Sequence, residues 1–265
     1  MLKRLLFFAY GTFAYLIFLA TFLYAIAFVG GFVVPTQLDG PSQGSITTAL
    51  LIDALLLIVF AVQHSVMARR WFKERWTQII PWAIERSTFV LCASAALLLL
   101  FWKWRPIGIE VWTVDNDLAR VALWILFAAG WGTVLVMTFL INHFDLFGLR
   151  QVWLLLIGKT YTPVEFRTPL PYRIIRHPLY FGFLLAFWMT PHMTLAHLVF
   201  ALATTAYIVL AIQFEERDLL SEHGASYAEY RRRVPMLLPG MRRAALGVPA
   251  ASSSAESAAT LTPRR

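Results

Sequence analysis

Residues 5–34 form a long apolar run that contains no charged side chain. As a helix rising about 1.5 Å per residue, this run exceeds the roughly 30 Å hydrocarbon core of a bilayer. The rest of the chain has the same character, because 59% of its residues are hydrophobic and only 14% are charged, against about 25% charged in a soluble domain. The sequence therefore predicts an integral membrane protein whose constant partner is the lipid bilayer.

Further apolar runs follow at residues 46–67, 87–104, 118–141, 178–191 and 194–214. The run at 178–191 is shorter than the roughly 17 to 25 residues needed to cross unaided, and Pro191 and His192 separate it from the last run. We predict an all-α polytopic membrane bundle with four spans and a C-terminal helical hairpin, five to six membrane segments in all. Residues 1–171 are expected to form the bundle with its cytoplasmic loops, 172–240 a cofactor-binding core, and 247–265 a disordered tail.

The basic residues predict the orientation. With a cytoplasmic N-terminus, 20 of the 23 Lys and Arg residues fall on the inside, and only Lys103, Arg105 and Arg120 fall outside, as the positive-inside rule requires. The net charge of +8 then reflects topology and anionic lipid, and the scatter of the basic residues predicts no nucleic-acid partner. We expect a multi-pass membrane protein with both termini and the active site on the cytoplasmic side. The sequence leaves the oligomeric state open.

Ionisable residues stand at both ends of the predicted hairpin. Arg176 and His177 precede one apolar run, and Glu215 and Glu216 follow the other. Such groups are costly beside hydrocarbon, so they mark a functional site. Pro178 suits the first position of a helix, whose N-terminus favours an anion such as a carboxylate.

Two further features describe the ligand. Gly182 would let a planar group approach the helix backbone, and two glutamates at a helix C-terminus call for a cationic or hydroxyl-rich compensating group. A molecule with a carboxylate, an aromatic base, ribose hydroxyls and a positive centre satisfies all of these demands, and S-adenosylmethionine is such a molecule. No Cys/His spacing typical of a metal site occurs, so no metal is predicted.

Three segments resemble a known family signature. They read RHPLYFG at 176–182, EERDLL at 215–220 and YAEYRRRVPMLLP at 227–239. In this order they resemble the C-terminal core of integral-membrane methyltransferases, which include the isoprenylcysteine carboxyl and phospholipid N-methyltransferases and enclose S-adenosylmethionine between the last helices and the C-terminal segment. By that resemblance the cofactor-binding residues are Arg176, His177, Pro178, Tyr180, Gly182, Glu215, Glu216, Tyr227, Tyr230 and Arg231.

A wider resemblance extends from the first helix to Pro239. The segments INHFDLFGLRQVW at 141–153, YTPVEFRTPLPYRIIRHP at 161–178 and LLAFWMTPHMT at 184–194 are similar to the nurim family, in particular to its bacterial methanethiol S-methyltransferases. The resemblance implies an enzyme that transfers the methyl group of S-adenosylmethionine to methanethiol and releases dimethyl sulfide.

Methyl transfer to a thiol needs a thiolate, because the thiolate and not the thiol is the nucleophile. Candidates for the base that removes the proton are His143, Asp145 and Glu216, of which His143 ranks first for its near-neutral intrinsic pKa. Methanethiol is small and apolar, so its pocket should be narrow and lined by aromatic residues such as Phe144, Phe147, Trp153, Tyr180 or Trp188.

Other interpretations stay open at this point. The acceptor is alternatively another thiol, a prenylcysteine or a lipid amine, and the chain is alternatively a non-enzymatic membrane scaffold of the nurim type. Arg176, His177 and Tyr180 would suit an interfacial belt. Asn142, His143 and Asp145 would suit a cap at the end of the fourth helix. Asp53 and His64 lie on one face of the second span, where they suit a function or a buried packing pair. Only an enzyme requires Arg176, His177, Tyr180 and Glu216 to converge on one cytoplasm-facing cavity.

Overall fold

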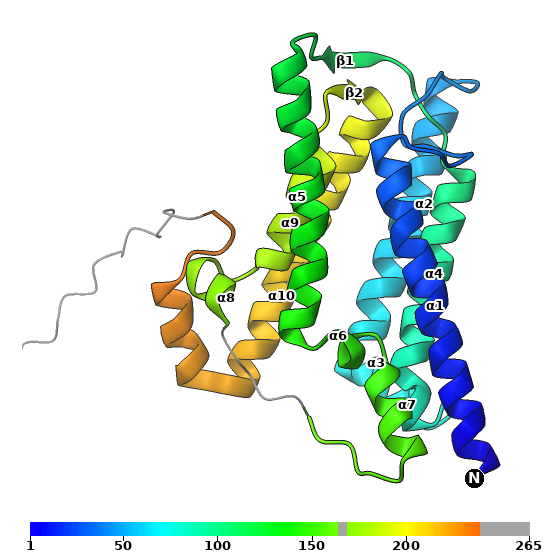
Figure 1. The fold of residues 1–265 in the computed structure, drawn as a ribbon, viewed down its shortest axis with the longest axis vertical. Coiled ribbons are helices and arrows are strands. Elements are labelled where there is room, and N and C mark those ends of the chain that lie inside the picture. Colours follow the sequence, from blue (N-terminus) through cyan, green and yellow to red (C-terminus); the bar gives the residue numbers. More distant parts are fainter. Residues whose placement is uncertain (164–168, 239–265) are drawn as a thin grey trace, which may run out of the picture.

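Long helices dominate the computed structural model, which describes residues 1–163 and 169–238 (Figure 1). Five helices are long and apolar enough to cross a membrane: α1 (Leu2–Gly30), α2 (Ile46–Ala68), α4 (Trp82–Lys103), α5 (Asp117–Ile141) and α10 (Leu195–Arg233). The prediction of an all-α polytopic bundle is confirmed. The tail expected at 247–265 lies outside the described residues.

The predicted segments differ from the observed helices in two places. The first helix ends at Gly30 and does not continue to residue 34, because Gly31 adopts a left-handed conformation with φ 71° that closes the helix. The last two runs are unequal: α9 (Pro178–Trp188) has 11 residues, whereas α10 has 39. At about 1.5 Å per residue α9 rises only about 16 Å, so α10 is the crossing helix of this pair.

Short helices gather at the end of the bundle where α1 begins (Figure 1). They are α3 (Arg70–Trp76), α6 (His143–Leu146) and α7 (Leu149–Leu156), whereas α8 (Leu170–Ile174) lies apart from them, beside α10. We call this end the basic end, because Lys3, Arg70, Arg86 and Arg150 lie in the elements that start or finish there. A run of basic residues beside apolar spans is typical of a cytoplasmic membrane face.

The opposite end, here called the strand end, carries a two-stranded antiparallel ladder. Strand β1 (Glu110–Thr113) pairs with β2 (His192–Thr194), with Thr113 opposite His192. Beside it, Asp39 accepts a hydrogen bond from Thr194 Oγ1 at 2.6 Å and contacts His197 Nδ1 at 2.8 Å. The ladder thus joins the α4–α5 connection to the α9–α10 turn. The sequence analysis missed both strands, which are too short to show an alternating pattern.

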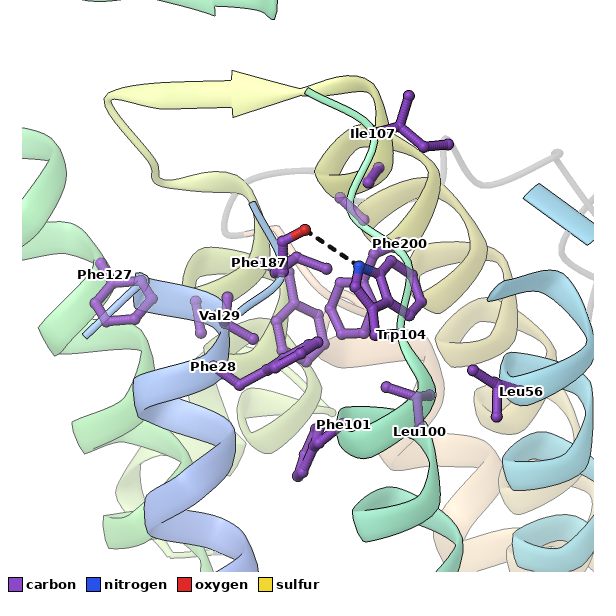
Figure 2. Packing of buried hydrophobic residues seen from close by; sticks show 14 of the residues in the cluster. Phe28, Val29, Leu56, Leu100, Phe101, Trp104, Ile107, Phe127, Phe187 and Phe200 are labelled. Atoms are coloured by element: carbon purple, nitrogen blue, oxygen red, sulfur yellow. Dashed lines mark hydrogen bonds between the residues drawn. The ribbon is translucent and has the colours of Figure 1, made fainter. Parts of the chain in front are cut away.

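The main hydrophobic core lies in the half of the bundle nearer the strand end. Phe28 packs against Phe101 with ring centroids 4.8 Å apart, and Phe187 packs against Phe200 at 5.0 Å. Trp104 lies between these pairs, and its indole N–H donates to the Leu38 carbonyl at 3.1 Å (Figure 2). These contacts hold α1, α4, α9 and α10 together, which leaves the basic end for polar groups.

Two glycines allow α5 and α9 to approach closely. A Cβ atom on Gly130 would lie 2.6 Å from the Ala186 nitrogen and 2.8 Å from the Gly182 oxygen, and one on Gly182 would lie 2.9 Å from the Gly130 oxygen. The face of Gly182 on which we expected a planar ligand is therefore covered by the backbone of α5. This contact gives Gly182 a packing role and no support as a cofactor-binding residue.

Asp53 and His64 of α2 have separate surroundings and are not a hydrogen-bonded pair. Asp53 is buried and accepts from the backbone N–H of Arg105 at 2.9 Å. The His64 ring instead lies against Phe60 and Phe89, with centroids 5.3 and 5.0 Å away. Asp53 thus fixes the chain just after α4, and His64 packs within an aromatic layer.

Candidate active site

The candidate site is built around the corner between α8 and α9. The backbone N–H groups of Arg176 and His177 donate to the carbonyls of Pro235 and Met236, at 2.9 and 3.2 Å. Pro178 takes the first position of α9 as predicted, where a missing N–H costs nothing. The corner is therefore fastened to the segment that follows α10.

Glu216 of α10 lies at the centre of a charged cluster. Its Oε1 accepts from Arg176 Nε at 2.7 Å and lies 3.1 Å from His177 Nε2. Its Oε2 lies 3.1 Å from Arg231 Nε. Glu216 is 2% exposed, and a buried carboxylate persists only with such partners. We call these four residues the Glu216 cluster.

A bend in α10 brings Arg231 back to Glu216. In a straight helix these residues would lie about 22 Å apart, but Gly224 has φ 53° and ψ −124° and interrupts the helical conformation. The chain therefore turns back on itself (Figure 1, orange). Within this returning arm, Tyr227 is buried and Tyr230 donates to the Tyr172 carbonyl at 2.6 Å. Burial raises the pKa of Tyr172 itself, so the phenol next to the arm stays neutral.

Glu215 lies beside the Glu216 cluster, on its solvent-exposed side. Its side chain is 46% exposed, with Oε2 at 4.0 Å from His177 Nδ1. The Tyr180 hydroxyl donates a hydrogen bond to the same carboxylate. The predicted residues Arg176, His177, Tyr180, Glu215, Glu216 and Arg231 are thus assembled in one place, and they are held by one another.

His143 and Asp145 form a second polar group, just beyond the end of α5. The Thr138 hydroxyl donates to the Leu135 carbonyl at 2.7 Å, so its oxygen accepts from His143 Nδ1 at 2.8 Å. The proton therefore sits on Nδ1, and Nε2 accepts from the Tyr15 hydroxyl at 2.9 Å. Burial lowers the pKa of His143. The unprotonated Nε2 is the form that a general base requires.

Aromatic rings surround His143. Phe139 is stacked on its imidazole with centroids 4.1 Å apart, and Phe144 and Phe147 lie at 5.4 and 4.8 Å. Two of the residues predicted for an apolar pocket, Phe144 and Phe147, are therefore brought to the imidazole. Trp153 instead packs on Phe8 of α1.

The other two residues predicted for this pocket lie elsewhere. Tyr180 belongs with Glu215, as described, and Trp188 donates to Thr205 Oγ1 at 2.9 Å within the α9–α10 pair. The aromatic rings around His143 accordingly come from α1, α5 and α6, and they include neither Tyr180 nor Trp188.

Asp145 is already paired with a cation, which makes it a weaker candidate for the base than His143. Arg150 Nη1 approaches its Oδ1 at 2.9 Å, and the Tyr161 hydroxyl donates to Oδ2 at 3.3 Å. The neighbouring Asn142 side chain caps the short α6 through the N–H of Asp145. The helix-cap interpretation thus holds for Asn142, whereas His143 points into the aromatic group.

Both polar groups lie toward the basic end of the bundle (Figure 1). Sequence reasoning found the charged members of each group, but it missed Tyr15 and Thr138, which set the proton position on His143. Tyr15 is 128 residues away in the chain, and a tyrosine within an apolar span carries no signal of its own. Within the described residues, no group of three or more His, Cys, Asp or Glu side chains is placed to hold a metal.

Comparison with known proteins gives close relatives over most of the chain. A protein named methanethiol S-methyltransferase from Crocosphaera subtropica is 57% identical across 90% of this chain and 93% of its own length. A protein of the same name from Mycobacterium tuberculosis is 54% identical across 91% of this chain and 99% of its own. The chain belongs to the methanethiol S-methyltransferase family.

More distant similarity agrees with this membership. Nurim from Mus musculus is 30% identical over 66% of this chain and 70% of its own length, so the family resembles nurim as predicted. No family model matches the chain, and no solved structure matches it. The chain is therefore a membrane methyltransferase of this family.

Proposed function

We propose that this protein transfers a methyl group from S-adenosylmethionine to the sulfur of methanethiol and so forms dimethyl sulfide. The observation that carries the proposal is the Glu216 cluster, in which the α8–α9 corner, α10 and the returning arm meet through Arg176, Glu216 and Arg231. Relatives that are more than half identical carry the name methanethiol S-methyltransferase, which supports the choice of acceptor.

The donor set of the cluster fits S-adenosylmethionine. Arg231 contacts Glu216 through Nε, so its two terminal nitrogens remain for a second anion such as the amino-acid carboxylate. Glu215 is half exposed and is suited to ribose hydroxyls or an ammonium group, with the partly exposed Tyr180 supplying aromatic surface beside it. When bound there, the cofactor would supply an electrophilic methyl group on a sulfonium.

His143 is the proposed base for the acceptor. Glu216 has two arginine partners and a hydrogen bond with His177, and Asp145 is paired with Arg150. Such partners stabilise a carboxylate in its charged form and weaken it as a base. His143 offers an unprotonated Nε2 among apolar rings. The Tyr15 hydroxyl donates to Nε2, so the thiol proton would reach His143 through Tyr15, which passes its own proton to Nε2 and takes the thiol proton in its place. The thiolate sulfur would then accept the methyl group that a bound cofactor supplies, and the cofactor sulfur would keep the electron pair of the broken bond.

The side of the membrane follows from the charge distribution. The basic end holds both polar groups, and the positive-inside rule assigns such an end to the cytoplasm. A soluble cofactor made in the cytoplasm would reach the cluster from that side, and methanethiol, being small and apolar, would reach the aromatic group through the lipid.

Activity in cells tests the reaction. The chain is expressed in a host without the activity, methanethiol is fed, and dimethyl sulfide is measured in the headspace. The parent should produce it, and His177→Ala and Glu216→Ala should lose nearly all production. A well-expressed parent that makes no dimethyl sulfide would favour a different thiol, a prenylcysteine or lipid acceptor, or a scaffold, and full activity in both variants would place the site elsewhere.

Cofactor binding is tested separately on the purified protein. Replacing Arg231 with Gln removes the guanidinium that faces Glu216 and should weaken equilibrium binding of S-adenosylmethionine at least tenfold, in line with a charged hydrogen bond worth about 1.5–3 kcal/mol. Arg232→Gln is the matched control, because Arg232 is the next residue and its side chain is 76% exposed. Equal losses in the two variants would contradict the assignment of Arg231.

A further inference from the structure

A polar cavity lies at the basic end, outside the Glu216 cluster. Its volume is about 410 Å³, and it lies between α3, the first turn of α4 and the end of α5. The side chains that matter for its chemistry are Lys73, Trp82, Glu85, Arg86, Asp145 and Gln151. The proposed methyl transfer uses none of the first four.

The cations of this cavity are poorly compensated. Asp145 is occupied by Arg150 at 2.9 Å, and among the described residues no carboxylate lies within 4.0 Å of Lys73 or Arg86. Arg86 donates through Nε to the Leu146 carbonyl at 2.7 Å, which leaves its terminal nitrogens for another acceptor. Burial and the charge of Arg86 lower the pKa of Lys73. From a greater distance, Glu85 offsets part of the positive charge of Lys73, and Glu85 and Asp145 together offset part of that of Arg86.

Two further groups in the cavity point to a ligand. The first turn of α4 faces it, and the N-terminal end of a helix favours an anion. Gln151 is 7% exposed, and its Oε1 has no hydrogen-bond partner while its Nε2 donates to the Asp145 carbonyl at 3.1 Å. A buried acceptor of this kind needs a donor, and a hydroxyl group on the ligand would provide it.

The cavity also lies at the level where membrane spans start and end. Trp82 begins α4 and is 52% exposed, and Ile141 ends α5 and is 42% exposed. Exposed tryptophan beside basic residues is typical of the lipid headgroup region, and basic pockets between spans on the cytoplasmic side bind anionic headgroups. The surroundings therefore favour a lipid over a ligand free in solution.

We propose that this cavity binds a phosphate anion that carries a hydroxyl group, supplied by the headgroup of an anionic lipid such as phosphatidylglycerol. Arg86 and Lys73 contact the phosphate oxygens, and Gln151 accepts from the hydroxyl. Inorganic phosphate has the same chemistry and is the second possible source. The lipid would fasten α3 and α4 to the α5–α6 corner that carries His143.

Lipid binding to the full-length protein tests the site. Short-chain phosphatidylglycerol is titrated into the protein in neutral detergent, and the melting temperature is measured at each lipid concentration. The lipid concentration at half of the full shift gives the binding midpoint. Phosphatidylcholine and inorganic phosphate are titrated in parallel. The parent should bind phosphatidylglycerol more tightly than phosphatidylcholine. Lys73→Gln and Arg86→Gln should each weaken that binding about fivefold, the contribution of one basic side chain at a membrane surface.

Arg70→Gln is the matched control, because it removes the same charge from the same helix at a side chain that is 93% exposed. Lys73→Gln keeps the test valid if loss of Arg86 prevents folding. A parent that binds inorganic phosphate, with the same loss in Lys73→Gln, supports the anion site and assigns it to soluble phosphate.

Three results would overturn the proposal: an unchanged midpoint in Lys73→Gln, equal binding of phosphatidylcholine, or a loss of S-adenosylmethionine affinity in Lys73→Gln that Arg70→Gln does not share. The last result would make the cavity part of the cofactor site. None of these measurements needs methanethiol, so a failure of the proposed reaction and a failure of the lipid site are distinguishable.

Discussion

At the scale of single residues, Glu216 organises the largest number of charged contacts around the candidate site. It lies in α10, yet its partners come from the α8–α9 corner and from the returning arm. Removing one member of a buried ion pair leaves the others uncompensated, which costs more than the pair contributes. We therefore expect the carboxylate to be needed for folding as well as for the proposed cofactor binding.

We expect Glu216→Gln to lower the free energy of unfolding by about 3–5 kcal/mol, because it leaves Arg176 and Arg231 without a counter-charge. Thermal or denaturant unfolding in detergent would measure this change. Glu215→Gln is the control, since Glu215 is 46% exposed and exposed pairs contribute about 1 kcal/mol or less. Similar losses in both variants would contradict the buried cluster.

His143 makes stability depend on pH. Burial lowers its pKa in the folded protein below the unfolded value of about 6.5, so between these values the unfolded chain binds the proton more tightly. The His143 contribution is thus fully present above about pH 6.5 and is lost as the pH falls toward the folded pKa. We expect the melting temperature of the parent to fall more than that of His143→Gln when the pH is lowered from about 7.5 to about 5, a range that brackets the unfolded pKa. Parallel curves would show that His143 does not titrate there.

Motifs predicted the residues of the Glu216 cluster, because charges next to apolar runs are conspicuous in a sequence. They did not predict how these residues contact one another. The contact between Arg231 and Glu216 depends on the backbone of Gly224, and the proton position on His143 depends on Tyr15, from a helix distant in sequence. Such long-range partners carry no local pattern.

At the scale of elements, the contact of α5 with α9 decides where the α8–α9 corner lies. α9 is too short to cross a bilayer unaided, so its position depends on packing. Gly130 and Gly182 remove side chains from the interface and let the two backbones meet, as small residues do between membrane helices.

Gly130→Ala should destabilise the protein by about 1–3 kcal/mol, the usual cost of overpacking, because the new methyl group would lie 2.6 Å from the Ala186 nitrogen. Gly132→Ala on the same helix is the control, since nothing lies within 4 Å of a Cβ there, and it should be neutral or stabilising by up to about 1 kcal/mol. Unfolding curves of the two variants would decide, and an equal effect would exclude the close contact.

Helix bounds were largely predictable, because charge-free apolar runs of sufficient length define spans directly. The predicted helix ends were wrong where backbone geometry and not hydropathy decides the end, at Gly31 after α1 and at the C-terminal end of α10. The close approach of Gly130 to Gly182 was not predictable either, since each glycine is unremarkable in its own run and only the fold pairs them.

At the scale of the whole molecule, the charge distribution predicts how the bundle sits in the membrane. In cells expressing the chain with Cys92 replaced by Ser, a membrane-impermeant maleimide applied from outside should label Lys103→Cys near the strand end and not Arg70→Cys at the basic end. Both positions are exposed. Labelling should reverse in inverted vesicles, and the opposite pattern would place the active site outside the cytoplasm.

The β1–β2 ladder acts as a pivot for the molecule. It holds the start of α10 at the strand end, and Glu216 lies about 32 Å further along that helix. A tilt of only about 5° around such a fixed point would shift the carboxylate by about 3 Å, the length of one hydrogen bond. The alignment of the Glu216 carboxylate with its partners is thus sensitive to how the opposite end of the molecule holds α10.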